Sequence, residues 1–108
     1  MLESKVEDWM REQVRRRGGA FYKFVSPGTI GVPDRIILRN GGRVTFVELK
    51  QDHGRLSEIQ KVQIGKLRAL GADVRVVYGR KQAEELIDEL FPKAPPTGGV
   101  GFGIEEWR

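Results

Sequence analysis

Two acidic side chains and a lysine near the middle of the chain have the types and spacing of a chemical site. Asp34 follows an irregular loop rich in Gly and Pro, Glu48 comes fourteen residues later, and Lys50 follows Glu48 by two. Side chains alternate between the two faces of a β-strand, so residues two apart project from the same face. Glu48 and Lys50 therefore share a face if their segment is a strand.

The segment between the two acids has the signature of a β-hairpin. Asn40-Gly41-Gly42 separates two runs of strand-forming residues, and these three residue types tolerate the positive φ of a tight turn. A three-residue loop at this point sets a register in which Asp34 faces Glu48. Their Cβ atoms are then expected about 4.5–5.5 Å apart. Asp34, Glu48 and Lys50 are thus predicted to converge at one end of the hairpin.

Two opposed carboxylates repel each other unless a cation lies between them. Paired carboxylate oxygens, with a carbonyl oxygen and waters, suit Mg²⁺ or Mn²⁺, whose remaining positions bind phosphate oxygens. Such a metal lowers the pKa of a bound water, and a neighbouring lysine orients that water or stabilises charge on the phosphate. The predicted chemistry is phosphate ester hydrolysis, with Asp34 and Glu48 as metal ligands and Asp34, Glu48 and Lys50 as catalytic residues.

The same three residues have an ordinary structural interpretation. An Asp after Pro33 is typical of a strand that starts at a turn, and Glu48 with Lys50 is typical of a solvated, salt-bridged sheet edge. That interpretation does not explain why both charges interrupt an apolar run at the end that faces Asp34. We therefore favour the functional interpretation.

Hydrophobic spacing and turn residues predict an α/β fold with a mixed central sheet of about four strands flanked by helices. The order is α-β-β-β-α-β-α, and a right-handed crossover places the fourth strand parallel to the third. The predicted elements are a helix at 4–17, strands at 20–25, 34–39 and 43–50, a helix at 57–70, a strand at 73–78 and a helix from 79 to before Pro92. The buried stripe of the second helix is expected to comprise Ile59, Val62, Leu67 and Leu70.

Residues 1–91 are predicted to form one domain and the Pro- and Gly-rich residues 92–108 a C-terminal tail. Several apolar residues exceed what one small core needs, and they are candidates for a homodimer interface. The alternative is that they fold back onto their own subunit. These residues are Trp9 and Met10 in the first helix and Phe102, Ile104 and Trp107 in the tail.

Charge is unevenly distributed along the chain. Residues 1–83 carry 17 basic and 9 acidic side chains, whereas residues 84–108 carry 2 basic and 6 acidic ones. A strongly basic body is suited to a polyanion, and nucleic acid is the first partner to consider. Contacts with DNA phosphates are predicted for Arg15, Arg16, Arg17, Lys23, Arg55 and Lys61. For the three consecutive arginines the alternative is a favourable interaction with a helix C-terminus.

Composition excludes several other classes of site. The chain has no Cys and one His, so disulfides, thiolate metal sites and imidazole clusters are excluded, and any metal must have oxygen ligands. The N-terminal residues lack an apolar signal region, and no apolar run is long enough to cross a bilayer. We expect a cytoplasmic protein with no membrane partner and no small-molecule organic cofactor.

The motifs taken together resemble those of a nuclease family. Gly31-Val32-Pro33-Asp34 followed by Val47-Glu48-Leu49-Lys50 resembles the PD-(D/E)XK nuclease signature. The resemblance narrows to the virus-type replication-repair nuclease (VRR-NUC) domain, over roughly residues 7–78, through Glu7, Ser26-Pro27-Gly28, Gly54-Arg55-Leu56-Ser57 and Gln60. It implies a restriction-endonuclease-like fold, Asp34 and Glu48 as metal ligands, Lys50 as the catalytic lysine, and Glu7 and Gln60 as accessory site residues.

The two accessory residues also have a complete structural explanation. Glu7 and Gln60 each stand three residues after a serine, Ser4 and Ser57 respectively, which is the spacing of a helix capping box. The residues alone favour capping, and the resemblance makes the two interpretations about equal.

The leading hypothesis is a DNA endonuclease that depends on Mg²⁺ or Mn²⁺. Compact stand-alone VRR-NUC domains are similar to Holliday-junction resolvases, which implies a homodimer that cuts branched DNA, such as a four-way junction, in a phage or in DNA repair. The alternatives are a non-catalytic nucleic-acid-binding module and a nuclease subunit of a larger repair or restriction complex.

Overall fold

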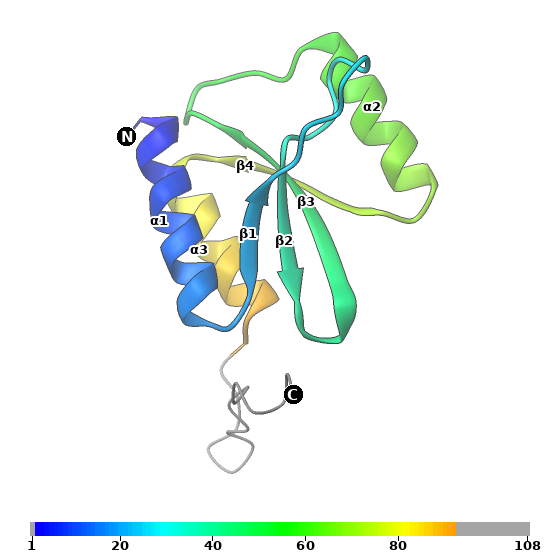
Figure 1. The fold of residues 1–108 in the computed structure, drawn as a ribbon. Helices are drawn as coiled ribbons and strands as arrows, with labels where there is room; N and C mark the ends of the chain where they lie inside the picture. Colours follow the sequence, from blue (N-terminus) through cyan, green and yellow to red (C-terminus); the bar gives the residue numbers. More distant parts are fainter. Residues whose placement is uncertain (1, 93–108) are drawn as a thin grey trace.

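The chain folds as an α/β unit in the predicted order, with a four-stranded mixed sheet and three α-helices (Figure 1). The computed structural model describes residues 2–92. Its elements are α1 (Glu3–Arg16), β1 (Ala20–Lys23), β2 (Arg35–Arg39), the 3₁₀ turn η1 (Asn40–Gly42), β3 (Arg43–Lys50), α2 (Glu58–Ala69), β4 (Asp73–Tyr78) and α3 (Gly79–Leu90). The predicted fold class is confirmed.

The strands lie in the order β1-β2-β3-β4. The first three are antiparallel neighbours, and β4 is parallel to β3, as the predicted crossover through α2 requires. The hairpin turn places Gly41 and Gly42 at φ values of 80° and 71°, which side chains with a Cβ rarely adopt. Arg39 pairs with Arg43, and Arg35 pairs with Val47. The predicted hairpin register is confirmed.

Helices cover both faces of the sheet. Helices α1 and α3 lie side by side over one face, and α2 lies on the other side of the sheet (Figure 1). The larger core forms under α1 and α3, where Val47 and Leu49 of β3 pack among buried residues of both helices. Strand alternation turns Phe46, Glu48 and Lys50 toward the opposite face.

The first helix contributes a fully buried stripe. Val6, Met10 and Val14 recur every four residues, which places them on one side of α1, and Met10 is 0% exposed. The prediction that Met10 is available for a subunit interface is therefore wrong. Trp9 is half-buried against the same core, and the guanidinium of Arg80 lies 3.9 Å from its ring centroid.

The predicted buried stripe of α2 is wrong. Ile64 is the buried residue and Leu67 is half-buried, whereas Ile59, Val62 and Leu70 are exposed, Leu70 to 86%. Apolar residues surround more than half of this helix, and the sheet covers only the side that carries Ile64. Spacing alone identified the wrong side as the buried one.

About half of the element ends match the predicted ones, and the others differ by one or two residues. The predicted first strand reached residue 25, whereas β1 ends at Lys23. Predictions for the tail beyond residue 92, including Phe102, Ile104 and Trp107, lie outside the described residues. Within residues 2–92, no helix has both the length and the apolar character needed to span a bilayer.

Candidate active site

The end of β3 carries a buried carboxylate beside an ammonium group. The Glu48 side chain is 9% exposed, the Lys50 side chain is 20% exposed, and Lys50 Nζ lies 3.8 Å from Glu48 Oε2. Val47 and Leu49, the residues that alternate with them, are buried in the core under α1 and α3. This anchoring fixes the orientation of Glu48 and Lys50 toward the other face.

Asp34 ends the loop before β2 and approaches the same site. Its backbone carbonyl accepts a hydrogen bond of 2.8 Å from the Phe24 N–H, which ties the loop to the end of β1. The register of β2 with β3, continued by one residue, places Asp34 opposite Glu48. The Asp34 side chain is 59% exposed, so it reaches solvent while Glu48 does not. The structure thus brings Asp34, Glu48 and Lys50 together.

The electrostatics of the site favour a cation. Burial raises the pKa of Glu48 above its usual value, the negative charge of Asp34 raises it further, and the Lys50 ammonium opposes both effects. Two neighbouring carboxylates, one of them largely desolvated, are stabilised in their charged form by a positive ion between them. The donor chemistry of Asp34 and Glu48 therefore fits a hard divalent metal.

The candidate metal site is small. Among residues 2–92, no group of three or more His, Cys, Asp or Glu side chains is placed to hold a metal ion. Two carboxylates are nevertheless a common protein contribution to Mg²⁺ sites, because this ion keeps several waters and binds substrate phosphate. Asp34 and Glu48 would supply those two carboxylates.

Arg35 connects Asp34 to the first helix. Its Nη1 lies 2.9 Å from Asp34 Oδ1, and its Nε donates a hydrogen bond of 2.8 Å to Glu7 Oε1. The Arg35 Nη2 donates to the same Glu7 oxygen, and Arg11 Nη2 lies 2.8 Å from Glu7 Oε2. Burial by itself would raise the pKa of Glu7, but the hydrogen bonds and charges of Arg35 and Arg11 hold it below its usual value.

The capping interpretation of Glu7 is wrong. Helix α1 begins at Glu3 after Leu2, and no side chain caps its N-terminus. Glu7 therefore has no capping role. It pairs with Arg35, which in turn pairs with Asp34. Its role as an accessory site residue stays a prediction.

The capping interpretation of Gln60 is confirmed. Gln60 Oε1 accepts a hydrogen bond of 2.9 Å from the Ser57 N–H, and Ser57 Oγ accepts one of 3.2 Å from the Gln60 N–H. These contacts account for the Gln60 side chain at the start of α2. The role of Gln60 as an accessory site residue stays a prediction.

A hollow beside Asp34 adds polar groups to the site. It encloses about 230 Å³, and its lining includes Asp34, Lys23, Ser26 and Thr29. Lys23 is one of the predicted DNA-binding residues, and the fold places it next to the candidate metal ligand. The hydroxyl groups of Ser26 and Thr29 were not predicted; the only local signal for them is the Ser26-Pro27-Gly28 motif.

The other predicted DNA-binding residues are spread over the surface. Arg15 and Arg16 both pair with Glu12, Arg17 Nη1 donates to Gln13 Oε1, and Lys61 pairs with Glu58. Arg15 follows Glu7 by eight residues in α1, which separates them by about 12 Å along the helix axis. The arginines at the end of α1 are therefore not gathered with Asp34. Arg55 is exposed in the loop between β3 and α2.

Sequence reasoning missed Arg35. The residue directly follows Asp34, but strand alternation predicts that neighbours point to opposite faces. Asp34 lies just outside β2, where strand alternation no longer applies. The Arg35 guanidinium therefore contacts both Asp34 and Glu7.

The fold and the site together define a class of protein. An α/β fold whose hairpin ends in two carboxylates and a lysine is the arrangement expected of PD-(D/E)XK nucleases. A family model described as the VRR-NUC domain matches residues 6–81. The chain belongs to the VRR-NUC family of nucleases, and the predicted resemblance is confirmed.

The chain is also similar to individual proteins. A protein of Acyrthosiphon pisum secondary endosymbiont phage 1, named "Putative nuclease p44", is 40% identical over 75 residues, which are 69% of this chain and 81% of the phage protein. A solved structure described as a "VRR_NUC domain" is 30% identical and superposes with a TM-score of 0.74. That match covers 80% of this chain and 94% of the solved chain.

VRR-NUC nucleases generally depend on divalent metals.

Proposed function

We propose that this protein is a metal-dependent DNA endonuclease that hydrolyses phosphodiester bonds at Asp34, Glu48 and Lys50. The observation that carries the proposal is a buried Glu48 carboxylate that lies 3.8 Å from the Lys50 ammonium and is acted on by the negative charge of Asp34. A buried carboxylate with a like charge beside it is costly, and such an arrangement is typical of a functional site. Family membership supports the same chemistry.

Each residue has a distinct role in this proposal. Asp34 and Glu48 would hold Mg²⁺ or Mn²⁺, which would supply Lewis-acid stabilisation of the phosphate and lower the pKa of a water. Lys50 orients the attacking water and stabilises negative charge that develops on the phosphate. Arg35 and Glu7 position Asp34, and Gln60 supports the site indirectly by fixing the start of α2.

Cleavage of labelled DNA tests the proposal. The wild-type protein should cut with Mg²⁺ or Mn²⁺ and not with EDTA. Asp34→Asn, Glu48→Gln and Lys50→Met should each lower the cleavage rate by about 10²-fold or more, as the loss of a charge-stabilising group does. Glu58→Gln, an exposed acid at the start of α2, is the matched control and should leave the rate unchanged.

Folding and DNA affinity complete that experiment. Glu48→Gln removes a repulsion in the metal-free protein, so its thermal stability should equal or exceed that of the wild type. Near-wild-type cleavage by Glu48→Gln would refute the assigned site. DNA binding without any cleavage by the wild type would favour a non-catalytic binding module.

A further part of the proposal is a homodimer that cuts branched DNA, with a four-way junction as the preferred substrate. It rests on the resemblance of compact VRR-NUC domains to junction resolvases and on the match between two symmetric active sites and two symmetric strands. Ile59, Val62 and Leu70 on one side of α2 are exposed, as is Ile30. Gly31 abuts the Ile59 backbone, so Ile30 and Ile59 belong to one region of the surface.

Light scattering and a cleavage panel test the dimer. A particle of twice the chain mass and paired, symmetric incisions in a four-way junction are expected. Val62→Glu should convert the dimer to a monomer if the exposed side of α2 is the interface. A monomer at micromolar concentration that cuts only flaps or linear strands would contradict this part and leave the metal-dependent chemistry intact.

A further inference from the structure

The hairpin has a second cluster of like charges, at the end opposite the candidate active site. Arg39 and Arg43 are directly opposed in the β2–β3 register. Like charges so placed are destabilising unless an opposite charge lies near them. The repulsion between the Asp34 and Glu48 carboxylates favours a cation beside them. In the same way, the repulsion between the Arg39 and Arg43 guanidinium groups favours an anion beside them.

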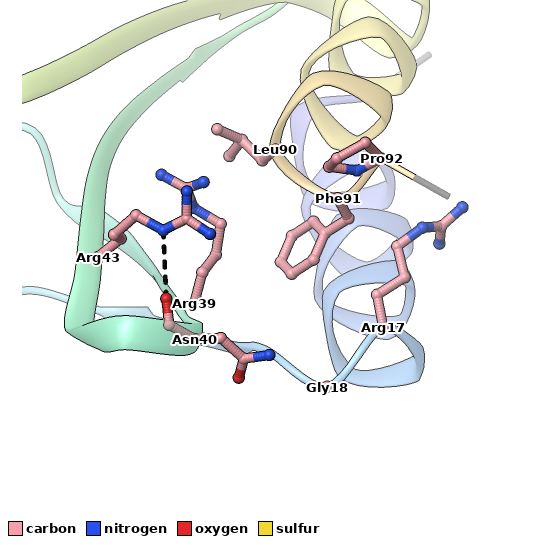
Figure 2. A pocket seen from close by; sticks show the side chains of 8 residues that line it. All are labelled: Arg17, Gly18, Arg39, Asn40, Arg43, Leu90, Phe91 and Pro92. Carbon is pink, nitrogen blue, oxygen red and sulfur yellow. Dashed lines mark hydrogen bonds between the residues drawn. The ribbon is translucent and has the colours of Figure 1, made fainter. Parts of the chain in front are cut away.

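These two arginines line a pocket of about 150 Å³, whose lining also includes Arg17 after the end of α1. Figure 2 shows the guanidinium groups of Arg39 and Arg43 close together and that of Arg17 on the far side of Phe91. The pocket forms where the hairpin turn meets the C-terminal ends of α1 and α3, and Leu90 and Phe91 supply its apolar wall. Residues from three separate elements thus converge on it, as in a preformed binding site.

The three arginines that line the pocket have no carboxylate partner, which Arg55 and Arg68 also lack among the described residues. Over residues 2–92, Arg17, Arg39 and Arg43 form no ion pair with a carboxylate, whereas ion pairs engage Arg11, Arg15, Arg16, Arg35, Arg75 and Arg80. Arg17 bonds to Gln13, Arg43 Nε donates to the Asn40 carbonyl, and Arg39 Nη2 donates to Thr45 Oγ1. Three cationic groups therefore bond only to neutral atoms.

One of these groups has an unsatisfied donor. The Nε atom of Arg39 is buried and has no hydrogen-bond partner among the described residues. A buried donor without a partner is uncommon and costly, so it indicates a missing acceptor.

Nearby negative charge does not neutralise the cluster. The C-terminal ends of α1 and α3 each contribute roughly half a negative charge, less in total than the two guanidinium groups of Arg39 and Arg43. The charge of Arg39 acts on Asp73 and Glu89, but Arg75 binds both carboxylates, at 2.6 and 2.7 Å, and neither residue lines the pocket. A net positive charge remains in the pocket.

We propose that Arg39 and Arg43 bind a phosphate group in this pocket. Planar guanidinium groups with several N–H donors match the oxygens of phosphate, and a pocket of this volume holds one such group. The bound phosphate is either a backbone phosphate of the DNA substrate or a free phosphate. Its assignment to DNA rests on the proposed nuclease function, whereas phosphate binding in the pocket does not. Lys50 follows Arg43 by seven positions in β3, so this phosphate would lie roughly 23 Å from the scissile bond.

Inorganic phosphate tests the pocket without DNA or metal. Phosphate at millimolar concentration should raise the melting temperature of the wild type above that in NaCl of equal ionic strength. The double variant Arg17→Gln/Arg43→Gln, which changes two exposed residues, should lose this shift. Lys66→Gln/Lys81→Gln, which removes the same charge from exposed positions elsewhere, should retain it. Circular dichroism checks that both variants fold.

DNA binding in EDTA distinguishes the two sources. If the phosphate belongs to DNA, the pocket variant should lower the slope of log affinity against log salt by about 0.9, and the lysine variant should not. Loss of the phosphate shift with an unchanged slope assigns the pocket to free phosphate. Retention of the phosphate shift by the pocket variant, or no shift in the wild type, would overturn the proposal. Cleavage by the Asp34, Glu48 and Lys50 variants decides the nuclease function separately.

Discussion

Arg35 and Glu7 form an ion pair across 28 residues of sequence, and it joins β2 to α1 beside the candidate active site. The Arg35 side chain is 11% exposed, and its remaining guanidinium nitrogen holds the Asp34 carboxylate. The helix that covers the core is thus connected to a candidate metal ligand through one arginine.

Replacement of Glu7 should affect both stability and cleavage. Glu7→Gln leaves the largely buried Arg35 without its main counter-charge, so we expect a loss of about 2 kcal/mol in the free energy of unfolding and a lower cleavage rate. Chemical denaturation and DNA cleavage measure the two effects. Asp8→Asn, an exposed acid on the same helix that pairs with Arg11, should change stability by less than about 0.5 kcal/mol. Equal effects of the two variants would contradict the positioning role.

Ser57 and Gln60 allow capping to be separated from a role in the site. Ser57→Ala and Gln60→Ala each break the capping box of α2 and should each cost about 1 kcal/mol of stability. If Gln60 acts only through the cap, both variants should reduce cleavage equally. A much larger loss of cleavage in Gln60→Ala, at equal stability, would show a direct contribution to the site.

Gly31 and Gly28 should respond differently to the same substitution. Both have positive φ, at 91° and 81°, so alanine is strained at either position and should cost about 1 kcal/mol. A Cβ at Gly31 would also lie 2.8 Å from the Ile59 carbonyl oxygen, whereas a Cβ at Gly28 meets open space. Gly31→Ala should therefore destabilise the protein by at least about 1 kcal/mol more than Gly28→Ala, measured by thermal unfolding. Similar melting temperatures would contradict the close approach of the loop to α2.

The stability of the fold should depend on Asp73 at acidic pH. Burial would raise the pKa of Asp73, but hydrogen bonds from Thr45 and Arg75 outweigh it and lower the pKa. A carboxyl group whose pKa is lower in the folded state stabilises the protein at pH values above the pKa that the same group has in the unfolded chain. This stabilisation is lost as the pH falls through the pKa of the group in the folded state. Asp73→Asn should thus destabilise the protein more at pH 7 than at pH 2. A constant difference in unfolding free energy between these pH values would refute the assignment.

The local features of the fold could be predicted from the sequence. Asn40-Gly41-Gly42 determined the hairpin register, and that register brings Asp34 to Glu48. The capping box of Ser57 and Gln60 determined the start of α2. Each of these features depends on residues a few positions apart, whose spacing is read directly from the chain.

Only the tertiary structure decided which surfaces are covered and which distant charges meet. Met10 is buried and Leu70 is exposed because α3 covers one side of α1 and the sheet covers only one side of α2. The contact of Glu7 with Arg35 and the pocket lined by Arg17 and the hairpin turn join segments far apart in the sequence. Spacing within one element specifies a face of a helix or strand, but the packing of the other elements determines what that face contacts.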